Sequence, residues 1–247
     1  MKTVEPKGKI ALVSGANRGI GKAITLELLN KGVAKVYAGA RNVETLSELV
    51  SAFGDRVIPI QLDVTDDHSI QRAASSIDEL DILVNNAGVF ALGGILSDVA
   101  LSSLESNLDI NVWGLVKLSN AVYPQLSKSE GSAIINISSL AGLGNMPMAA
   151  TYSVSKAAVH SITQGMRAEL SDKNTLVMGV YPGPIDTDMA AGLEMDKDSP
   201  TNVAQAIVNA LIQGTEDVFP DVMSQQAGNF YLSSPKAVEQ EFANFKA

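Results

Sequence analysis

Two serines, a tyrosine and a lysine lie close together in the stretch from Ile134 to Lys156. Ser138 and Ser139 follow a β-branched apolar run that predicts a buried strand, and a helical pattern begins at Tyr152. Tyr152 and Lys156 are four residues apart, so on a helix they share one face. If the intervening loop folds back, a hydroxyl, a phenol and an ammonium group converge. Such a group can hold and move a proton, provided that another molecule supplies an electron pair.

A glycine-rich turn follows the first predicted strand, Ile10–Ser14, and precedes a predicted helix, Gly19–Lys31. The turn reads SGANRGIG over residues 14–21. Its three glycines permit a tight turn, the close approach of a ligand and close helix–strand packing. The free N–H groups and the dipole at the start of the helix suit a diphosphate. This placement predicts a dinucleotide site, with turn geometry alone as the alternative.

The end of the second predicted strand, Lys35–Gly39, bears on which nucleotide binds. NAD-dependent enzymes usually place an acidic residue there to bind the ribose 2′-hydroxyl. This chain has Arg41 instead, and Arg18 of the glycine turn can approach the same place. Two guanidinium groups suit a 2′-phosphate through charge-assisted bonds. We therefore expect NADP(H), with two solvated surface arginines as the alternative.

Polar and small residues end the next two predicted strands. Asp63 follows the strand at 57–62 and is placed either to meet an adenine edge or to cap the following turn. The strand at 81–85 leads into Asn86, Ala87 and Gly88. Small residues here leave room for a flat ring, and the asparagine side chains can brace neighbouring loops.

Short apolar runs alternate with helical stretches along the whole chain. The remaining predicted helices cover 43–53, 69–77, 101–126, 152–170 and 202–212, and the remaining strands cover 134–137, 176–181 and 217–219. This alternation predicts parallel strands joined by right-handed crossovers, with helices on both faces. We therefore expect an α/β fold, a doubly wound and mostly parallel sheet of about seven strands, in a single domain over residues 1–247.

The C-terminal stretch, residues 234–245, has a helical pattern of its own. Ser234 and Pro235 suit an N-cap and a first helical position. Val238, Phe242 and Phe245 recur at i, i+4 and i+7 and form an apolar stripe. We expect a terminal helix that docks on the body or on a neighbouring subunit, with a functional lid as the alternative.

Composition excludes several classes of protein. The net charge of −9 and the sequence pI of about 4.7 argue against a nucleic-acid or anionic-membrane surface. The absence of cysteine excludes disulfides and thiolate chemistry. His68 and His160 are far apart and lack a ligand motif, so we expect no metal site. The apolar run Ile10–Val13 is too short for a signal peptide or a membrane span, and we expect a cytoplasmic protein.

Taken in order, these motifs resemble those of the short-chain dehydrogenase/reductase family. The matching segments are SGANRGIG at 14–21, DV at 63–64, NNAG at 85–88, Asn111 in DINVWG, SS at 138–139, YSVSK at 152–156 and PGPIDT at 182–187. Each segment is common singly, but the ordered set is highly specific. Ser14 stands where the family more often has threonine, which keeps the hydroxyl.

The resemblance implies roles for individual residues. It implies a catalytic group of Asn111, Ser139, Tyr152 and Lys156, where Ser139 is preferred to Ser138 because it precedes Tyr152 by the family's usual thirteen positions (152 − 139). It implies cofactor contacts from Gly15, Asn17, Arg18, Gly19, Ile20, Gly21, Arg41, Asp63, Val64, Asn86, Ala87, Gly88, Tyr152, Lys156, Pro182, Gly183, Ile185 and Thr187. It also implies a homodimer or homotetramer, with Trp113 in the core or at a subunit contact.

In the chemistry that the resemblance implies, Tyr152 gives a proton to a carbonyl oxygen while the nicotinamide provides the hydride. We expect the Lys156 ammonium and oxidised nicotinamide to lower the pKa of the phenol. Ser139 would hold the substrate oxygen. Asn111 would bind a water through a local distortion of its helix and so link Lys156 to solvent.

Apolar residues dominate the two segments expected around the substrate. They are Leu143, Met146 and Met148 before Tyr152, and Met189, Leu193 and Met195 within a substrate-loop region at 188–214. Lys197 is the one cation in these segments, so we expect an uncharged small-molecule ketone, aldehyde or secondary alcohol. The alternatives are an epimerase or dehydratase on the same fold, and a regulatory module that senses NADP(H) without catalysis.

Overall fold

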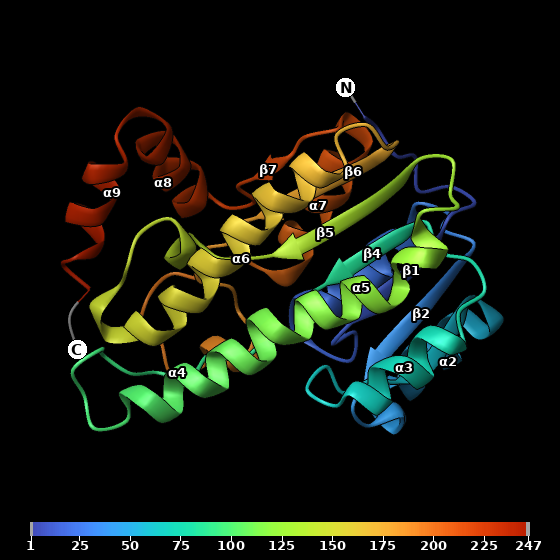
Figure 1. Cartoon of the computed structure of the whole chain (residues 1–247), viewed down its shortest axis with the longest axis horizontal. Helices are drawn as coiled ribbons and strands as arrows, with labels where there is room; N and C mark the ends of the chain where they lie inside the picture. Colours follow the sequence, from blue (N-terminus) through green and yellow to red (C-terminus); the bar gives the residue numbers. More distant parts are fainter. Residues whose placement is uncertain (1, 246–247) are drawn as a thin grey trace.

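The computed structural model describes residues 2–245 and contains a seven-stranded parallel sheet. The strands are β1 (Ile10–Ser14), β2 (Lys35–Ala40), β3 (Val57–Gln61), β4 (Ile82–Asn85), β5 (Ser132–Ile137), β6 (Thr175–Val180) and β7 (Asp217–Val218). Their order is β3-β2-β1-β4-β5-β6-β7, so the direction of winding reverses between β1 and β4. Figure 1 shows the arrows of β2, β4 and β5 pointing in a similar direction. The expected doubly wound α/β fold is confirmed.

Helices cover both faces of the sheet. They are α1 (Gly19–Asn30), α2 (Ser47–Phe53), α3 (Asp67–Ser75), α4 (Ala100–Leu108), α5 (Gly114–Leu126), α6 (Ala150–Glu169), α7 (Pro200–Gln213), α8 (Val222–Ser233) and α9 (Pro235–Phe242). One apolar cluster joins α1, α2 and α7 to the sheet, and a second joins α3, α5 and the end of α6 to the opposite face. Side chains of one strand alternate between the clusters: Ala11 and Val13 enter the first, and Leu12 enters the second. Both faces of the sheet are therefore buried, which explains the continuous apolar runs in its strands.

Two elements differ from the sequence-based expectation, and the long helix carries the local distortion that is expected at Asn111. The helix expected at 43–53 begins as a 3₁₀ turn over Val43–Leu46 and becomes α2 only at Ser47. The long helix expected at 101–126 is interrupted by a π-helical segment, Asp109–Trp113, between α4 and α5. Helix α8 was not expected at all. Its buried residues are Ser224, Ala227 and Gly228, which are small and produce no apolar periodicity.

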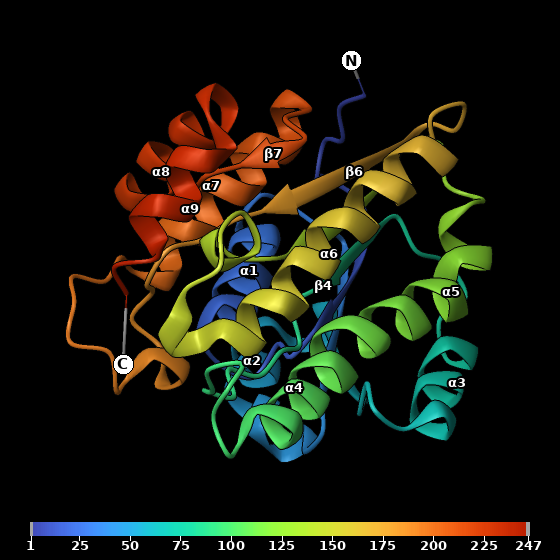
Figure 2. The same ribbon diagram turned by 60° about the vertical axis from the view of Figure 1, so that its left-hand side comes forward.

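The C-terminal helix docks on the body of the protein, as expected. Ser234 caps α9 by accepting a hydrogen bond from the Ala237 N–H, and Val238 and Phe242 are buried. These two side chains share a cluster with Leu140 and with residues of α8. Figures 1 and 2 show α8 and α9 together at one end of the molecule, near the loop that precedes α6.

The structure also corrects the expectations for the region 188–214 and for Trp113. The region 188–214 was expected to form a substrate loop, but its second half is α7, which packs against α1. Trp113 is 56% exposed, so it does not belong to the core.

Among residues 2–245, no helix is long and apolar enough to cross a membrane.

Candidate active site

A cavity of about 710 Å³ lies beyond the carboxyl ends of the strands, where the winding reverses. Parallel sheets of this topology bind ligands at this position. Every residue predicted for the site lines the cavity except Gly21, Asn111 and Leu143. Segments from the glycine turn at 15–20 to the loop at 182–195 thus come together around one space.

The glycine turn fits a diphosphate. Gly19 has φ +53°, and a Cβ there would lie 3.1 Å from Thr187 Cγ2. The N-cap of α1, Arg18, is extended and provides no side-chain cap, so the first N–H groups of the helix remain available to an acceptor. Gly21 does not line the cavity because it faces Gly15, whose carbonyl oxygen would lie 2.2 Å from an added Cβ. Gly21 therefore permits close packing of α1 on the turn.

Ser14 and Asn86 hold the segment after β4 against the glycine turn. The Ser14 hydroxyl donates to the Val84 carbonyl at 3.2 Å and accepts from the N–H groups of Asn86 and Ala87, both at 3.0 Å. The Asn86 amide donates to the carbonyls of Ser14 at 2.9 Å and Gly15 at 3.2 Å. The expected bracing role of the asparagine is therefore confirmed.

Asp63 caps the turn that follows β3. Its Oδ1 accepts hydrogen bonds from the Thr65 N–H at 3.0 Å and the Thr65 hydroxyl at 2.8 Å. The hydrogen bond from the Thr65 backbone is the main reason that the pKa of Asp63 is lowered, and the nearby Arg41 contributes. Asp63 also lines the cavity, so its contact with an adenine edge stays a prediction.

The two candidate phosphate-binding arginines are exposed and line the cavity. Arg18 Nη1 lies 3.1 Å from Asp188 Oδ2, and the two side chains are 65% and 75% exposed. Ion pairs at this exposure are worth about 0–1 kcal/mol. The pair therefore leaves Arg18 free to exchange Asp188 for a stronger anionic partner.

Of the two serines that follow β5, Ser139 is the one whose side chain lies beside the phenol of Tyr152. Ser138 is buried, and its hydroxyl donates to the Lys156 carbonyl at 3.0 Å. Ser139 caps a 3₁₀ turn by accepting from the Ala141 N–H at 3.2 Å, and its hydroxyl reaches the Tyr152 phenol. The structure thus brings Ser139, rather than Ser138, to the phenol.

Lys156 lies one helical turn after Tyr152 and on the same side of α6. Its Nζ is 5.6 Å from the centroid of the Tyr152 ring and donates to the Ile137 carbonyl at 2.8 Å. The end of β5 therefore orients the amine. Burial lowers the pKa of Lys156 to about 8.

The protein's own groups raise the pKa of Tyr152 rather than lower it. Burial raises this pKa to about 12, and the hydrogen bond with Ser139 acts in the opposite direction. The lowering of this pKa that we expect from Lys156 together with oxidised nicotinamide stays a prediction, because in the protein alone the loss of hydration is the largest influence on the phenol.

Asn111 lies in the π-helical segment, so the expected distortion of the helix is present. Its Oδ1 accepts from the Val89 N–H at 2.8 Å, and its Nδ2 donates to the Val89 carbonyl and to the Ser155 hydroxyl, both at 3.0 Å. A Cβ on Gly88 would lie 3.1 Å from Asn111 Oδ1 and 3.9 Å from Lys156 Nζ. Asn111 thus ties the segment after β4 to the long helix, behind the wall of the cavity.

Sequence reasoning missed many of the lining residues, among them Phe90, Met223 and Phe245, and it misplaced Leu143. Phe90 packs edge-to-face on Tyr152, with ring centroids 4.7 Å apart, and Met223 and Phe245 reach the cavity from the C-terminal elements. Phe90 follows the NNAG segment at 85–88 closely, so its place in the sequence could have indicated that it lines the cavity. Leu143 packs instead against the cluster beneath α8 and α9.

A phosphate-binding turn beside a phenol, a hydroxyl and an amine defines a dinucleotide-binding α/β oxidoreductase. The sequence profile of the short chain dehydrogenase family matches residues 9–198, and the chain belongs to this family.

Individual relatives agree with this assignment. An uncharacterised oxidoreductase of Staphylococcus saprophyticus is 34% identical over 221 residues, which cover 85% of this chain and 94% of that one. The crystal structure of a short chain dehydrogenase from Burkholderia cenocepacia, in complex with NADP, is 33% identical with a TM-score of 0.90, over 97% of this chain and 99% of that one. A short chain dehydrogenase/reductase from Burkholderia phymatum, in complex with NAD, shares the fold at 21% identity with a TM-score of 0.84, over 96% and 97% of the two chains.

Proposed function

We propose that this chain reduces an uncharged ketone or aldehyde with NADPH, or oxidises the corresponding alcohol with NADP⁺. The observation that carries the proposal is the convergence of Ser139, Tyr152 and Lys156 in the cavity that the glycine turn opens into. When bound, NADP(H) supplies or accepts the hydride.

The side chains handle the proton. Tyr152 is protonated at neutral pH, because its pKa is about 12, and can donate to a carbonyl oxygen that gains negative charge. Ser139 orients that oxygen by a second hydrogen bond. The positive charge of Lys156 stabilises the phenolate that remains, at the distance of 5.6 Å seen between Nζ and the ring centroid. We assign to Asn111 a water-binding role through the π-helical backbone, which links Lys156 to solvent.

Three features support NADP(H) over NAD(H). The turn after β2 carries Arg41 and no acidic residue, Arg18 is only weakly paired, and a relative binds NADP. Another protein of the same fold is in complex with NAD, so the fold alone does not determine which of the two cofactors binds. In a fluorescence titration we expect NADPH to bind at least tenfold more tightly than NADH, since charge-assisted hydrogen bonds contribute about 1.5–3 kcal/mol. Tighter binding of NADH would contradict the assignment.

The test of the mechanism is Tyr152→Phe. This variant keeps the ring but lacks the proton, so turnover of a carbonyl panel should fall about 10²–10⁴-fold while the Kd for NADPH stays unchanged. Tyr123→Phe on α5, whose ring packs in the core away from the cavity, is the matched control and should retain turnover. Near-normal turnover of Tyr152→Phe would refute the mechanism.

The same panel separates the alternatives. An epimerase or dehydratase would convert substrate without net change in the near-ultraviolet absorbance of reduced nicotinamide. A sensing module would bind NADPH and convert no carbonyl.

We also propose a homodimer or homotetramer. Leu101, Trp113 and Val154 are large apolar side chains exposed on α4, the π-helical segment and α6. Analytical ultracentrifugation tests this proposal, and a monomer at micromolar concentration would refute it.

A further inference from the structure

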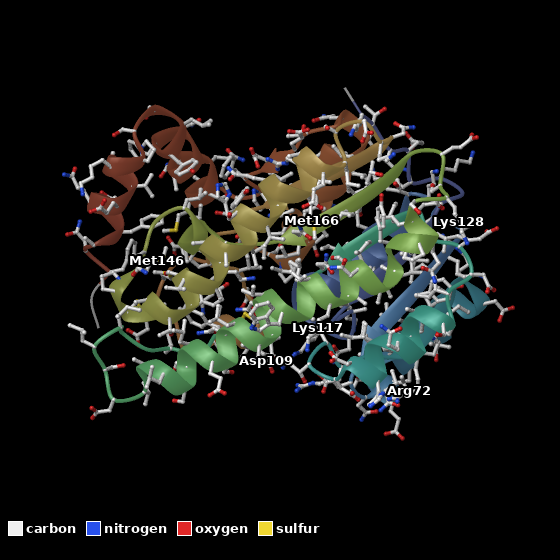
Figure 3. The ribbon with its side chains drawn as sticks, in the orientation of Figure 1. Arg72, Asp109, Lys117, Lys128, Met146 and Met166 are labelled. Atoms are coloured by element: carbon white, nitrogen blue, oxygen red, sulfur yellow. The ribbon has the colours of Figure 1, made fainter. Side chains whose placement is uncertain are left out.

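Part of the cavity lining is apolar and rich in methionine. Five of the protein's eight methionines line the cavity: Met146, Met148, Met189, Met195 and Met223. Figure 3 labels Met146 in the loop beside the first turns of α6. Methionine is flexible and polarisable, so such walls adapt to apolar groups of varied shape.

Among the described residues, the cations that line the cavity belong to other segments of the chain than these methionines. Arg18 belongs to the glycine turn and Arg41 follows β2, so both are at the nucleotide end, while Lys156 is held beside Tyr152 by the Ile137 carbonyl. A carboxylate placed among the methionines would lose hydration without gaining a positively charged partner. This loss is costly in an apolar site.

The C-terminal segment supplies part of this apolar wall. Phe245 lines the cavity, and its carbonyl oxygen accepts a hydrogen bond from the Met148 N–H at 3.0 Å. Its ring also packs edge-to-face against Phe242, with centroids 6.0 Å apart. The backbone of Phe245 is thus joined directly to the loop that carries Met146 and Met148.

Close packing of α9 fixes the position of Phe245. Val238 and Phe242 are 1% and 4% exposed and lie against Gly144. A Cβ at Gly144 would come within 2.8 Å of Val238 Cγ1 and of Phe242 Cδ2. Only glycine at position 144 therefore lets α9 approach the loop this closely.

We propose that α9 and Phe245 form a specificity wall at the substrate end of the cavity, which selects carbonyl compounds with a bulky uncharged apolar group, aryl or branched alkyl, beside the carbonyl. This inference rests on the proposed function for the identity of the reacting group. The wall acts on the substituent, whereas Ser139 and Tyr152 act on the oxygen. Its removal should consequently weaken binding of large apolar ketones and leave the cofactor site unchanged.

The test measures ligand binding directly. Acetophenone is titrated into NADP⁺-saturated protein by calorimetry, with 4-carboxyacetophenone as the charged analogue. We expect the wild type to bind acetophenone at least tenfold more tightly than the carboxylate, and Phe245→Ala to weaken acetophenone binding about tenfold, the scale of a lost apolar pocket contact. Phe245→Leu should restore part of the affinity. Phe230→Ala is the matched control, because Phe230 is 52% exposed on α8 and does not line the cavity.

Gly144→Ala provides an independent variant, since Gly144 does not line the cavity. Displacement of α9 should reproduce the loss of acetophenone affinity with an unchanged Kd for NADP⁺, which also shows that the variant is folded. The inference is overturned if the wild type does not bind acetophenone, if it binds the carboxylate equally well, or if Phe245→Ala binds acetophenone as tightly as wild type.

Turnover distinguishes this failure from failure of the proposed function. The wild type could bind acetophenone in a Phe245-dependent manner and yet reduce no ketone with NADPH. That result would refute the proposed function and support the specificity wall. Normal ketone reduction that does not depend on Phe245, in KM or in kcat, would refute the wall alone.

Discussion

Lys156→Met should change how the stability of the protein depends on pH. Lys156 is 6% exposed, and burial lowers its pKa from 10.5 to about 8. Because the folded pKa lies below the unfolded one, the unfolded chain binds more protons between these values, and the free energy of unfolding rises with pH across this window. For these two pKa values, the free energy of unfolding of the wild type rises by roughly 2–3 kcal/mol between pH 7 and pH 10.

The methionine variant has no amine to titrate and lacks this gain. Loss of the hydrogen bond to Ile137 adds an offset that is similar at both pH values, so it cancels in the comparison. Tyr152 is present in both proteins and cancels as well.

Urea unfolding followed by circular dichroism, at pH 7 and at pH 10, measures the difference. We expect the difference in the free energy of unfolding, wild type minus variant, to increase by roughly 2–3 kcal/mol between the two pH values. Lys128→Met is the matched control, because Lys128 is exposed beyond the end of α5, as Figure 3 shows, and it should follow the wild type. Parallel pH dependence of wild type and Lys156→Met would refute the argument that burial destabilises the charged amine.

Two further predictions concern catalysis and cofactor binding. The kcat/KM for carbonyl reduction should fall as pH rises through about 8, because Lys156 loses its charge in the free enzyme. The variant Lys156→Arg should move this fall to higher pH. A pH profile of kcat/KM that stays flat to pH 10 would contradict the role assigned to Lys156. Asp188→Asn should release Arg18 and tighten NADPH binding about two- to fivefold in a fluorescence titration, the scale of an exposed ion pair. Unchanged or weaker binding would show that Arg18 does not reach the 2′-phosphate.

The parts of this protein that could be predicted are those with a local signal. Strand β5 is buried on both faces, so three isoleucines and an alanine mark it in the sequence, and the turn after β1 is marked by its glycines. Helix α8 has no such signal, because Ser224 and Gly228 occupy its buried face. Loop residues have no periodicity that shows whether a side chain points toward the cavity or away from it. For this reason the sequence placed Leu143 around the substrate, whereas it packs beneath α8 and α9.

Sequence by itself determined the order of the elements, the glycine turn after β1 and the pairing of Tyr152 with Lys156, because each depends on residues only a few positions apart. Tertiary structure alone decided that Phe245 lies against Met148, that Asp188 pairs with Arg18, and that Lys156 loses its hydration. These outcomes arise where segments distant in the chain meet, and the place where they meet is set by the packing of the whole molecule. A pKa depends on the same packing, since burial is a property of the surroundings and not of the residue.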